Sequence, residues 1–394
     1  MSAYLDHAAT TPMSPQAIEI MTKSLEQDLG NPTALHSKGR AARAALDNSR
    51  ELIADTLEIL PAEVIFTSGG TEADNLALNA AQGGKILVSP IEHSAVLKPA
   101  MAKGAELLKV DRDGILDLDY LKSKLDKDVA LVSVMLVNNE IGTIEPMEQI
   151  VKIIRKKSPQ AIIHTDAIQA FGWTDVKKII SQVDLVSISA HKIQGPKGIG
   201  ALIAKKNIQL HPLLLGGGQE SGKRSGTPNV AGAVAMGLAI DQVISNADQV
   251  QQRVTALTDK LTQGLLQNID GVWQTISTKQ KAANNCHLLF DGLESEALLM
   301  VLDEMGICAS AGSSCASGAL EPSHVLMAIG LSEQQAKGAI RFSLGASSTE
   351  QEIDFALENI PLAVQQLRQV VEIDGYFTPA KPIQRINGPQ GGLR

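Results

Sequence analysis

The stretch VDLVSISAHKIQGPKGIGALIAK (183–205) places two short apolar runs on either side of a polar turn. The runs, 183–190 and 200–205, are rich in β-branched residues and almost continuously apolar, which is typical of strands buried on both faces of a sheet. The turn between them places His191 and Lys192 directly after the first strand. A lysine at that position is partly desolvated, which lowers the pKa of its amine toward the neutral form that attacks carbonyl groups.

Similar apolar runs lie upstream, and several are separated by amphipathic segments such as 146–157. The runs are EVIFTS (63–68), KILVSP (85–90), VALVSVML (129–136) and AIIHTD (161–166). Strands that alternate with helices indicate a mostly parallel α/β sheet covered by helices, and an antiparallel α+β arrangement is the alternative that the pattern leaves open. We assign this large domain to residues 13–250.

The pattern changes after residue 250. A polar helix (248–267) is followed by shorter strands at 284–292 and 339–345, and then by two helical runs divided by Pro361. We predict a second, smaller α+β domain formed by residues 1–12 and 251–373. Residues 374–394 contain three Pro and four Gly, a composition that predicts an extended or disordered tail.

Composition excludes several classes of protein. The chain has 394 residues, 44% of them hydrophobic, a net charge of −8 and only 3% aromatic residues, so we expect no direct binding of nucleic acid. Three cysteines in 394 residues argue against a disulfide framework and favour a reducing, cytoplasmic location. The longest apolar run, 230–240, is too short to cross a bilayer, and the amino-terminal residues resemble no secretory signal, so we expect no membrane association.

Two familiar motifs are matched only in part. GGQESGKR (217–224) fits the start of a nucleotide-binding P-loop but continues with Arg224 where Ser or Thr is needed to hold Mg²⁺, which disfavours an NTPase. Cys308 and Cys315 have no second pair of ligands nearby, so we expect no metal site.

Polar residues follow four of the predicted strands, where ligands bind in an open α/β sheet. TSGGTEADN (67–75) is a glycine-rich turn entering a helix, which is either a phosphate site or a simple helix cap. His93 follows the strand at 85–90 and is either structural or catalytic. Asp166 ends the strand at 161–166 and needs a cationic partner, because burying an unpaired carboxylate is costly. Together with Lys192, these groups match what pyridoxal 5′-phosphate requires: an amine for its aldehyde, an anion for its ring nitrogen, a phosphate cup and a group over the ring.

The chain resembles the cysteine desulfurases of the NifS/IscS type, within the class V aminotransferase-like enzymes that use pyridoxal phosphate. The resemblance implies an aspartate aminotransferase-like fold of type I and extends over nearly the whole chain. The motifs are YLDHAATTP (4–12), GNPTALHSKG (30–39), SGGTEADN (68–75), EHSA (92–95), VNNEIGTIEP (137–146), HTDAIQ (164–169), SAHKIQGPKG (189–198), GGGQESGKRSGTPN (216–229), SAGSSCASG (310–318) and IRFSLG (340–345).

The resemblance also implies roles for individual residues. Lys192 would form the Schiff base with the cofactor, Asp166 would bind the pyridinium nitrogen, and His93 would stack on the ring and shuttle protons. The other implied contacts are Gln169 to the phenolic oxygen; Thr71, Ser189 and His191 to the phosphate, with Gly70 giving close backbone approach; Thr227 to the phosphate of the neighbouring subunit in a homodimer; and Asn31, Asn139 and Arg341 to the substrate, with Asn139 also beside the cofactor.

The three cysteines receive different interpretations. Cys315 lies among small residues in 309–322, and from the residues alone it is either a buried packing residue or a reactive thiol. The resemblance implies that its thiolate takes the sulfur atom of the substrate and becomes a persulfide. We interpret Cys286 and Cys308 as core packing.

The implied reaction converts L-cysteine to L-alanine and passes sulfur to acceptor proteins, either an iron–sulfur scaffold or a tRNA-thiolation enzyme. The alternatives are another pyridoxal-phosphate lyase or aminotransferase, such as a selenocysteine lyase, and a sulfur-transfer scaffold with little catalysis. The chain departs from the family pattern in two places. Gly70 stands where many relatives have alanine, and QESGKRSGTPN (219–229) differs from the commoner QERGxRSGTEN.

Overall fold

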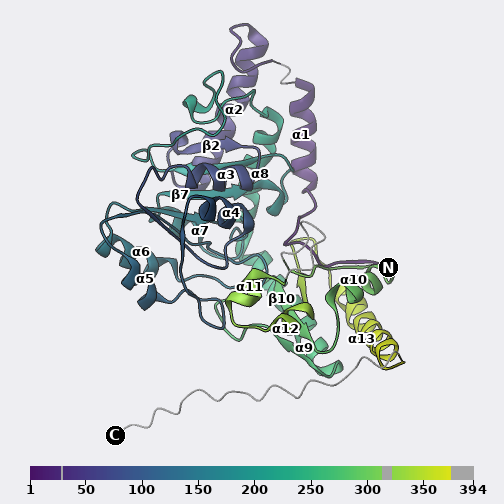
Figure 1. Cartoon of the computed structure of the whole chain (residues 1–394). Helices are drawn as coiled ribbons and strands as arrows, with labels where there is room; N and C mark the ends of the chain where they lie inside the picture. The colour runs from purple at the N-terminus through teal and green to yellow at the C-terminus, as the bar shows by residue number, and fades with distance from the viewer. Residues whose placement is uncertain (28–29, 313–321, 374–394) are drawn as a thin grey trace.

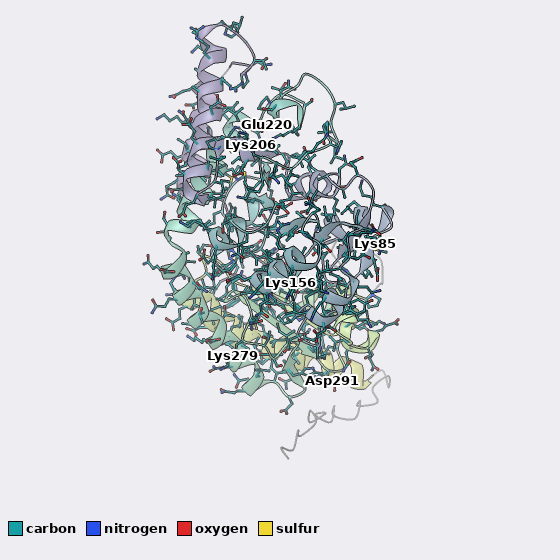
Figure 2. The ribbon with its side chains drawn as sticks, turned by 90° about the vertical axis from the view of Figure 1, so that its left-hand side faces the viewer. Lys85, Lys156, Lys206, Glu220, Lys279 and Asp291 are labelled. Atoms are coloured by element: carbon teal, nitrogen blue, oxygen red, sulfur yellow. The ribbon has the colours of Figure 1, made fainter. Side chains whose placement is uncertain are left out.

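The computed structural model describes residues 1–27, 30–312 and 322–373 of the chain. Figure 1 shows a large body built around a central sheet, with a smaller body below it that contains the amino terminus and the last helix. In the rotated view of Figure 2, Glu220 lies in the upper, large body and Asp291 in the lower, smaller one.

The large body contains a seven-stranded sheet in the order β2-β8-β7-β6-β5-β3-β4. Only β8 runs antiparallel to its neighbours, so the mostly parallel sheet predicted from the sequence is confirmed. Its strands are β2 (Val64–Thr67), β3 (Lys85–Val88), β4 (Glu106–Leu107), β5 (Val129–Ser133), β6 (Ile162–Asp166), β7 (Leu185–Ser189) and β8 (Gly200–Ala204).

Helices cover both faces of this sheet because its side chains alternate between two cores. Val186 and Ile188 of β7 lie in one core with residues of α2, α6, α7 and α8, while Leu185 lies in another core with residues of α3. The helices of this body are α1 (Pro15–Gln27), α2 (Ser37–Leu57), α3 (Gly70–Leu78), α4 (Ser94–Ala102), α5 (Leu118–Lys124), α6 (Met147–Lys157), α7 (Val176–Ile180) and α8 (Val230–Ser245).

The smaller body has its own core, to which the amino terminus contributes. Strand β1 (Ala3–Tyr4) pairs in parallel with β11 (Ile307–Cys308), and Ala3 and Leu5 pack in a cluster otherwise drawn from residues 254–364. The remaining elements are the antiparallel strands β9 (Val272–Gln274), β10 (Asn285–Phe290) and β12 (Ala339–Ser343), with α9 (Ala247–Asn268), α10 (Ser295–Glu304), α11 (His324–Ala328), α12 (Glu333–Lys337) and α13 (Glu350–Ile373). The domain boundaries at residues 12 and 250 stay a prediction. The core that the amino terminus shares with residues 254–364 supports them.

The expected break at Pro361 is wrong, because α13 continues through that residue. Proline removes one backbone donor and clashes with the preceding turn, which usually ends or kinks a helix. Here the apolar stripe of α13 lies in the smaller core on both sides of the proline: Ile353, Ala356 and Ile360 before it, and Ala363 and Val364 after it. Burial of this stripe outweighs the local cost.

The expectation for Cys308 is also wrong. In β11, Ile307 faces the core and Cys308 points outward and is exposed, because successive side chains of a strand alternate between faces. Cys286 lies in β10 and is buried in the smaller core, as expected.

Within the described part of the chain, no individual helix combines the length and apolar composition needed to cross a membrane. Only α8 and α9 taken together, with a bend of 70° between them, meet those two criteria.

The continuity of α13 predicts a difference between two neighbouring residues. Ile360 is fully buried and Leu362 is 54% exposed. We expect Ile360→Ala to lower the free energy of unfolding by about 2–5 kcal/mol, because it leaves a cavity in the core. Leu362→Ala, the matched control, should change it by less than about 0.5 kcal/mol. Urea unfolding of both variants measures this, and equal effects would contradict the packing described.

Candidate active site

A cavity of about 350 Å³ opens where the carboxyl ends of β6 and β7 face the amino end of α3 and strand β12 of the smaller body. Most of the residues singled out in the sequence line it. They are Gly70, Thr71, His93, Asn139, Asp166, Gln169, Ser189, His191, Lys192 and Arg341, together with Ala8, Ala9, Asp74, Met135, Ile168, Ser310 and Gly312.

Lys192 lies in a short 3₁₀ turn, Ala190–Lys192, directly after β7. Its Nζ donates hydrogen bonds to the backbone oxygens of Ala8 at 2.5 Å and Ala9 at 2.7 Å. Burial, and then the positive charge of Arg341, lower the pKa of this amine to about 8. The neutral, nucleophilic form is therefore accessible near neutral pH.

Asp166 is the last residue of β6 and is only 4% exposed. One carboxylate oxygen accepts the backbone N–H of Ile168 at 2.8 Å. Burial raises the pKa of this carboxyl group to about 6, against the opposing effects of that hydrogen bond and of the charge of Lys192. At neutral pH the carboxylate is mainly ionised, as a partner of a cationic ring nitrogen must be.

His93 precedes α4 and caps it, because its Nδ1 accepts the backbone N–H of Ala95 at 3.1 Å. Burial, and then the charges of Lys192 and His324, lower the pKa of the imidazole to about 4. A neutral ring that accepts at Nδ1 carries its proton on Nε2. His93 therefore enters the cavity as an uncharged aromatic ring with one donor.

Groups suited to a phosphate gather at the amino end of α3. The first residues of this helix are Gly70 and Thr71, and Ser189 and His191 line the same cavity. Backbone N–H groups at a helix start attract anions, and hydroxyl groups add donors. A Cβ atom on Gly70 would lie 2.2 Å from Cδ1 of Ile168, so this chain has no room for the alanine of other family members unless Ile168 moves.

Arg341 comes from β12 and is 3% exposed. It donates from Nη1 to the backbone oxygen of Asn139 at 2.8 Å and from Nη2 to Asp6 at 2.9 Å, while its buried Nε has no hydrogen-bond partner among the described residues. Gln169 donates to the backbone oxygen of Ala8 at 2.8 Å, and the same oxygen accepts from Lys192. A guanidinium with a donor to spare suits a carboxylate ligand.

Two of the described residues named from the sequence, Asn31 and Thr227, are not brought into this cavity. Asn31 is exposed, and its side-chain oxygen accepts from the backbone and hydroxyl of Thr33. Thr227 is also exposed and does not line the cavity. Cys315 lies outside the described residues.

Sequence reasoning missed Asp74, which lines the cavity and is completely buried. Burial, and then the charge of Asp166, raise the pKa of its carboxyl group well above the ordinary value. His164 Nε2 lies 3.7 Å from this carboxyl group. The spacing of the sequence could have indicated this position, because Asp74 follows Thr71 by three residues and therefore lies on the same side of α3.

Comparison with known proteins agrees with this geometry. The aminotransferase class-V family matches residues 3–355. A cysteine desulfurase IscS of Dictyoglomus turgidum is 42% identical, with 93% of this chain and 95% of the relative aligned. An IscS-like cysteine desulfurase of Mycobacterium tuberculosis is 41% identical over 93% of this chain and 97% of its own length.

Solved structures show the same similarity. A NifS-like protein superposes with a TM-score of 0.86 at 34% identity, covering 93% of this chain and all (100%) of that one. A NifS-like protein of Rickettsia africae gives a TM-score of 0.83 at 30% identity, over 94% of this chain and 100% of its own. The chain therefore belongs to the aminotransferase class-V family and, within it, to the cysteine desulfurases of the IscS/NifS type. The resemblance and the fold class predicted from the sequence are confirmed.

The cavity predicts an unusual titration of Lys192 in the cofactor-free protein. Because the pKa of the amine is lowered to about 8 from the ordinary 10.5, labelling by an amine-reactive anhydride should reach half its maximal rate near pH 8. Mass spectrometry of the labelled peptide follows the reaction. The same peptide from unfolded protein is the control and should titrate near the ordinary value, and a midpoint of 10.5 in the folded protein would refute the assigned environment.

Proposed function

We propose that this chain is a pyridoxal-phosphate-dependent cysteine desulfurase that uses the cavity described above. The observation that carries the proposal is the joint presence, in one cavity, of the Lys192 amine with its lowered pKa and of the Asp166 carboxylate. Enzymes of this family depend on pyridoxal phosphate. The similarity to the cysteine desulfurases supports this choice of reaction over other reactions of the cofactor.

The residues present fit the cofactor. Lys192 would attach its aldehyde, Asp166 would bind the ring nitrogen, and His93 would lie against the ring. Thr71, Ser189 and His191, with the backbone at Gly70, would hold its phosphate, and Gln169 would bind its phenolic oxygen. When bound, pyridoxal phosphate supplies an electron sink that stabilises negative charge on the substrate.

Arg341 would bind the carboxylate of L-cysteine, because its buried guanidinium keeps a free donor at Nε. Asn139, whose backbone oxygen fixes the same guanidinium, would orient the substrate beside it. We assign Asn31 to substrate binding on the family pattern alone, because it is exposed and lies outside the cavity in the single chain.

Lys192 would take the α-proton of the substrate. The pKa of its amine is about 8, so a useful fraction is neutral near neutral pH. His93 is neutral, and its ring proton lies on Nε2 because Nδ1 accepts the Ala95 amide, so the ring would donate a hydrogen bond to the substrate and help to shuttle the proton. The ammonium of Lys192, formed when the amine takes the α-proton, would be the acid that returns a proton.

Cys315 would complete the reaction. Its thiolate would bond to the substrate sulfur as the carbon–sulfur bond breaks, with the bonding electrons staying on the carbon fragment, which gains protons and leaves as L-alanine. The resulting persulfide would be passed to an acceptor protein, either an iron–sulfur scaffold or a tRNA-thiolation enzyme, in the cytoplasm.

The active unit would be a homodimer. Thr227 is exposed and lies outside the cavity of its own subunit, as a residue that serves a neighbouring subunit would. Leu213, Leu214 and Leu215, in the same part of the chain, are 42%, 45% and 85% exposed. A run of exposed leucines supports a covered interface there.

Replacing Lys192 by Ala should abolish the production of alanine from L-cysteine, because the amine both attaches the cofactor and moves the proton. Alanine is measured by amino-acid analysis, with Lys156→Ala, a substitution in α6, as the control for loss of a lysine. Production of alanine at the normal rate by the Lys192 variant would refute the assignment.

Replacing Cys315 by Ala should leave the absorbance of the bound cofactor near ~420 nm intact, because that band requires only the lysine and the cavity. Persulfide formation and sulfur transfer to an acceptor protein should be lost, as measured by alkylation and mass spectrometry. Cys308→Ala is the matched control, because Cys308 is an exposed cysteine outside the proposed sulfur-transfer loop, and should retain both. Sulfur transfer by the Cys315 variant would disprove the persulfide role.

A further inference from the structure

Two arginine–glutamate pairs hold the segment 214–227 against the large body. Arg50 donates from Nη1 and Nη2 to Glu220 at 2.9 and 2.7 Å. Arg224 donates from Nε and Nη2 to Glu72 at 2.8 and 3.2 Å. All four side chains are at most 20% exposed, and a two-pronged contact of this kind fixes orientation as well as distance.

The Arg50–Glu220 pair attaches the segment to the edge of the central sheet. Strand β2 is the edge strand, and its Phe66 amide donates to Glu220 at 3.0 Å while Arg50 donates to the backbone oxygen of Val64 at 2.5 Å. Figure 2 shows Glu220 in the upper part of the large body. The pair therefore fixes the middle of the segment.

The Arg224–Glu72 pair attaches the segment to the turn that begins α3. Glu72 directly follows Thr71, and its Oε2 also accepts the backbone N–H of Ser68 at 2.8 Å. One carboxylate therefore binds both Arg224 and the turn whose amide groups would cradle the phosphate. Neither Glu72 nor Arg224 lines the cavity, so the pair acts from outside it.

Charge makes this contact important for a phosphate. Burial opposes ionisation of Glu72, but the hydrogen bonds from Arg224 and Ser68 prevail and lower the pKa of the carboxyl group. Glu72 is therefore an anion next to the cradle, where it would repel a phosphate if its charge were not balanced. Arg224 supplies the balancing charge.

Arg224 is also close in the chain to Thr227. Between them, Ser225 is buried and donates from its amide to the backbone oxygen of Leu214 at 3.2 Å, and the Gly226 amide donates to Gln219 at 2.9 Å. Because Leu214 and Gln219 belong to the same segment, these hydrogen bonds tie 214–227 together as one unit, and a displacement of Arg224 is passed on to Thr227.

We propose that the Arg224–Glu72 pair is a positioning element that couples the two cofactor sites of the dimer. The pair joins the phosphate cradle of its own subunit to the segment whose Thr227 reaches the cradle of the partner, so the inference rests on the proposed function. Phosphate bound in one cradle then favours the segment arrangement that completes the other. Because such coupling is reciprocal, each site affects the affinity of its partner equally.

Mixed dimers separate the effect of Arg224 on the cofactor site of its own subunit from its effect on the cofactor site of the partner subunit. One subunit carries Lys192→Ala, so that only the intact subunit gives the cofactor absorbance near ~420 nm. Arg224→Ala is then placed either on the intact subunit or on the subunit that lacks Lys192. We expect both placements to weaken binding of pyridoxal phosphate at the intact site about tenfold, equivalent to about 1.4 kcal/mol.

A second readout does not involve the cofactor or activity. Inorganic phosphate should raise the Tm of the cofactor-free wild-type dimer more than that of the Arg224→Ala dimer. Arg155→Ala is the matched control for both measurements, because it breaks a pair with Asp184 at 2.7 Å of similar burial. That pair lies beside the first residues of β6 and β7, at the opposite end of these strands from the cavity, and its loss should leave both readouts unchanged.

Each result has a distinct meaning. Weaker binding only when Arg224→Ala is on the intact subunit, or no weakening in either placement, overturns the coupling. Thr227→Ala on the subunit that lacks Lys192 tests the proposed function instead: unchanged binding at the intact site would show that Thr227 does not reach the partner. If Arg224→Ala does not form dimers, Arg224→Gln, which keeps a hydrogen-bond donor but loses both the charge and the two-pronged contact, gives the same comparison.

Discussion

The amine of Lys192 is held by the backbone oxygens of Ala8 and Ala9 in the amino-terminal segment, and the rest of the site depends on this contact. The same amino-terminal segment binds the turn after β7, where Thr11 donates from its amide and hydroxyl to the backbone oxygen of His191. Asp6, in the same segment, pairs with Arg341 of the smaller body. One short segment thus sets the distance between the lysine and the arginine that would bind the substrate.

Burial shifts the pKa values of the ionisable side chains in the cavity and so sets their protonation states. The pKa values are about 4 for His93, about 6 for Asp166 and about 8 for Lys192. Near pH 7 this gives a neutral imidazole, a carboxylate that is mainly ionised and an amine that is roughly one-tenth neutral. The ordinary pKa of a lysine would leave far less neutral amine, so partial burial supplies the base that the proposed reaction needs.

The sheet and the centre of the site could be predicted from the sequence because both depend on local signals. Strands buried on both faces are continuously apolar, and Asp166 ends one of them while Lys192 lies in the turn that follows another. The continuous helix through Pro361 and the outward direction of Cys308 could not be predicted, since both depend on which face of an element meets the smaller core. The acceptors of Lys192 are backbone atoms, which no pattern of side chains reveals. Asn31 and Thr227 lie outside the cavity of the single chain, so their assignment depends on the family resemblance alone.

The pairing of the amino terminus with late parts of the chain has a consequence for synthesis on the ribosome. Strand β1 pairs with β11, and the backbone of His7 donates to Ser343. The first residues to be made must therefore wait for residues beyond 340 before they reach their final positions. The helices and parallel strands of the large body can assemble earlier, because their contacts are closer in sequence. Residues 6–9 and the lysine turn can take up their final arrangement only after nearly the whole chain has been translated, so the complete cavity is among the last features of the fold to form.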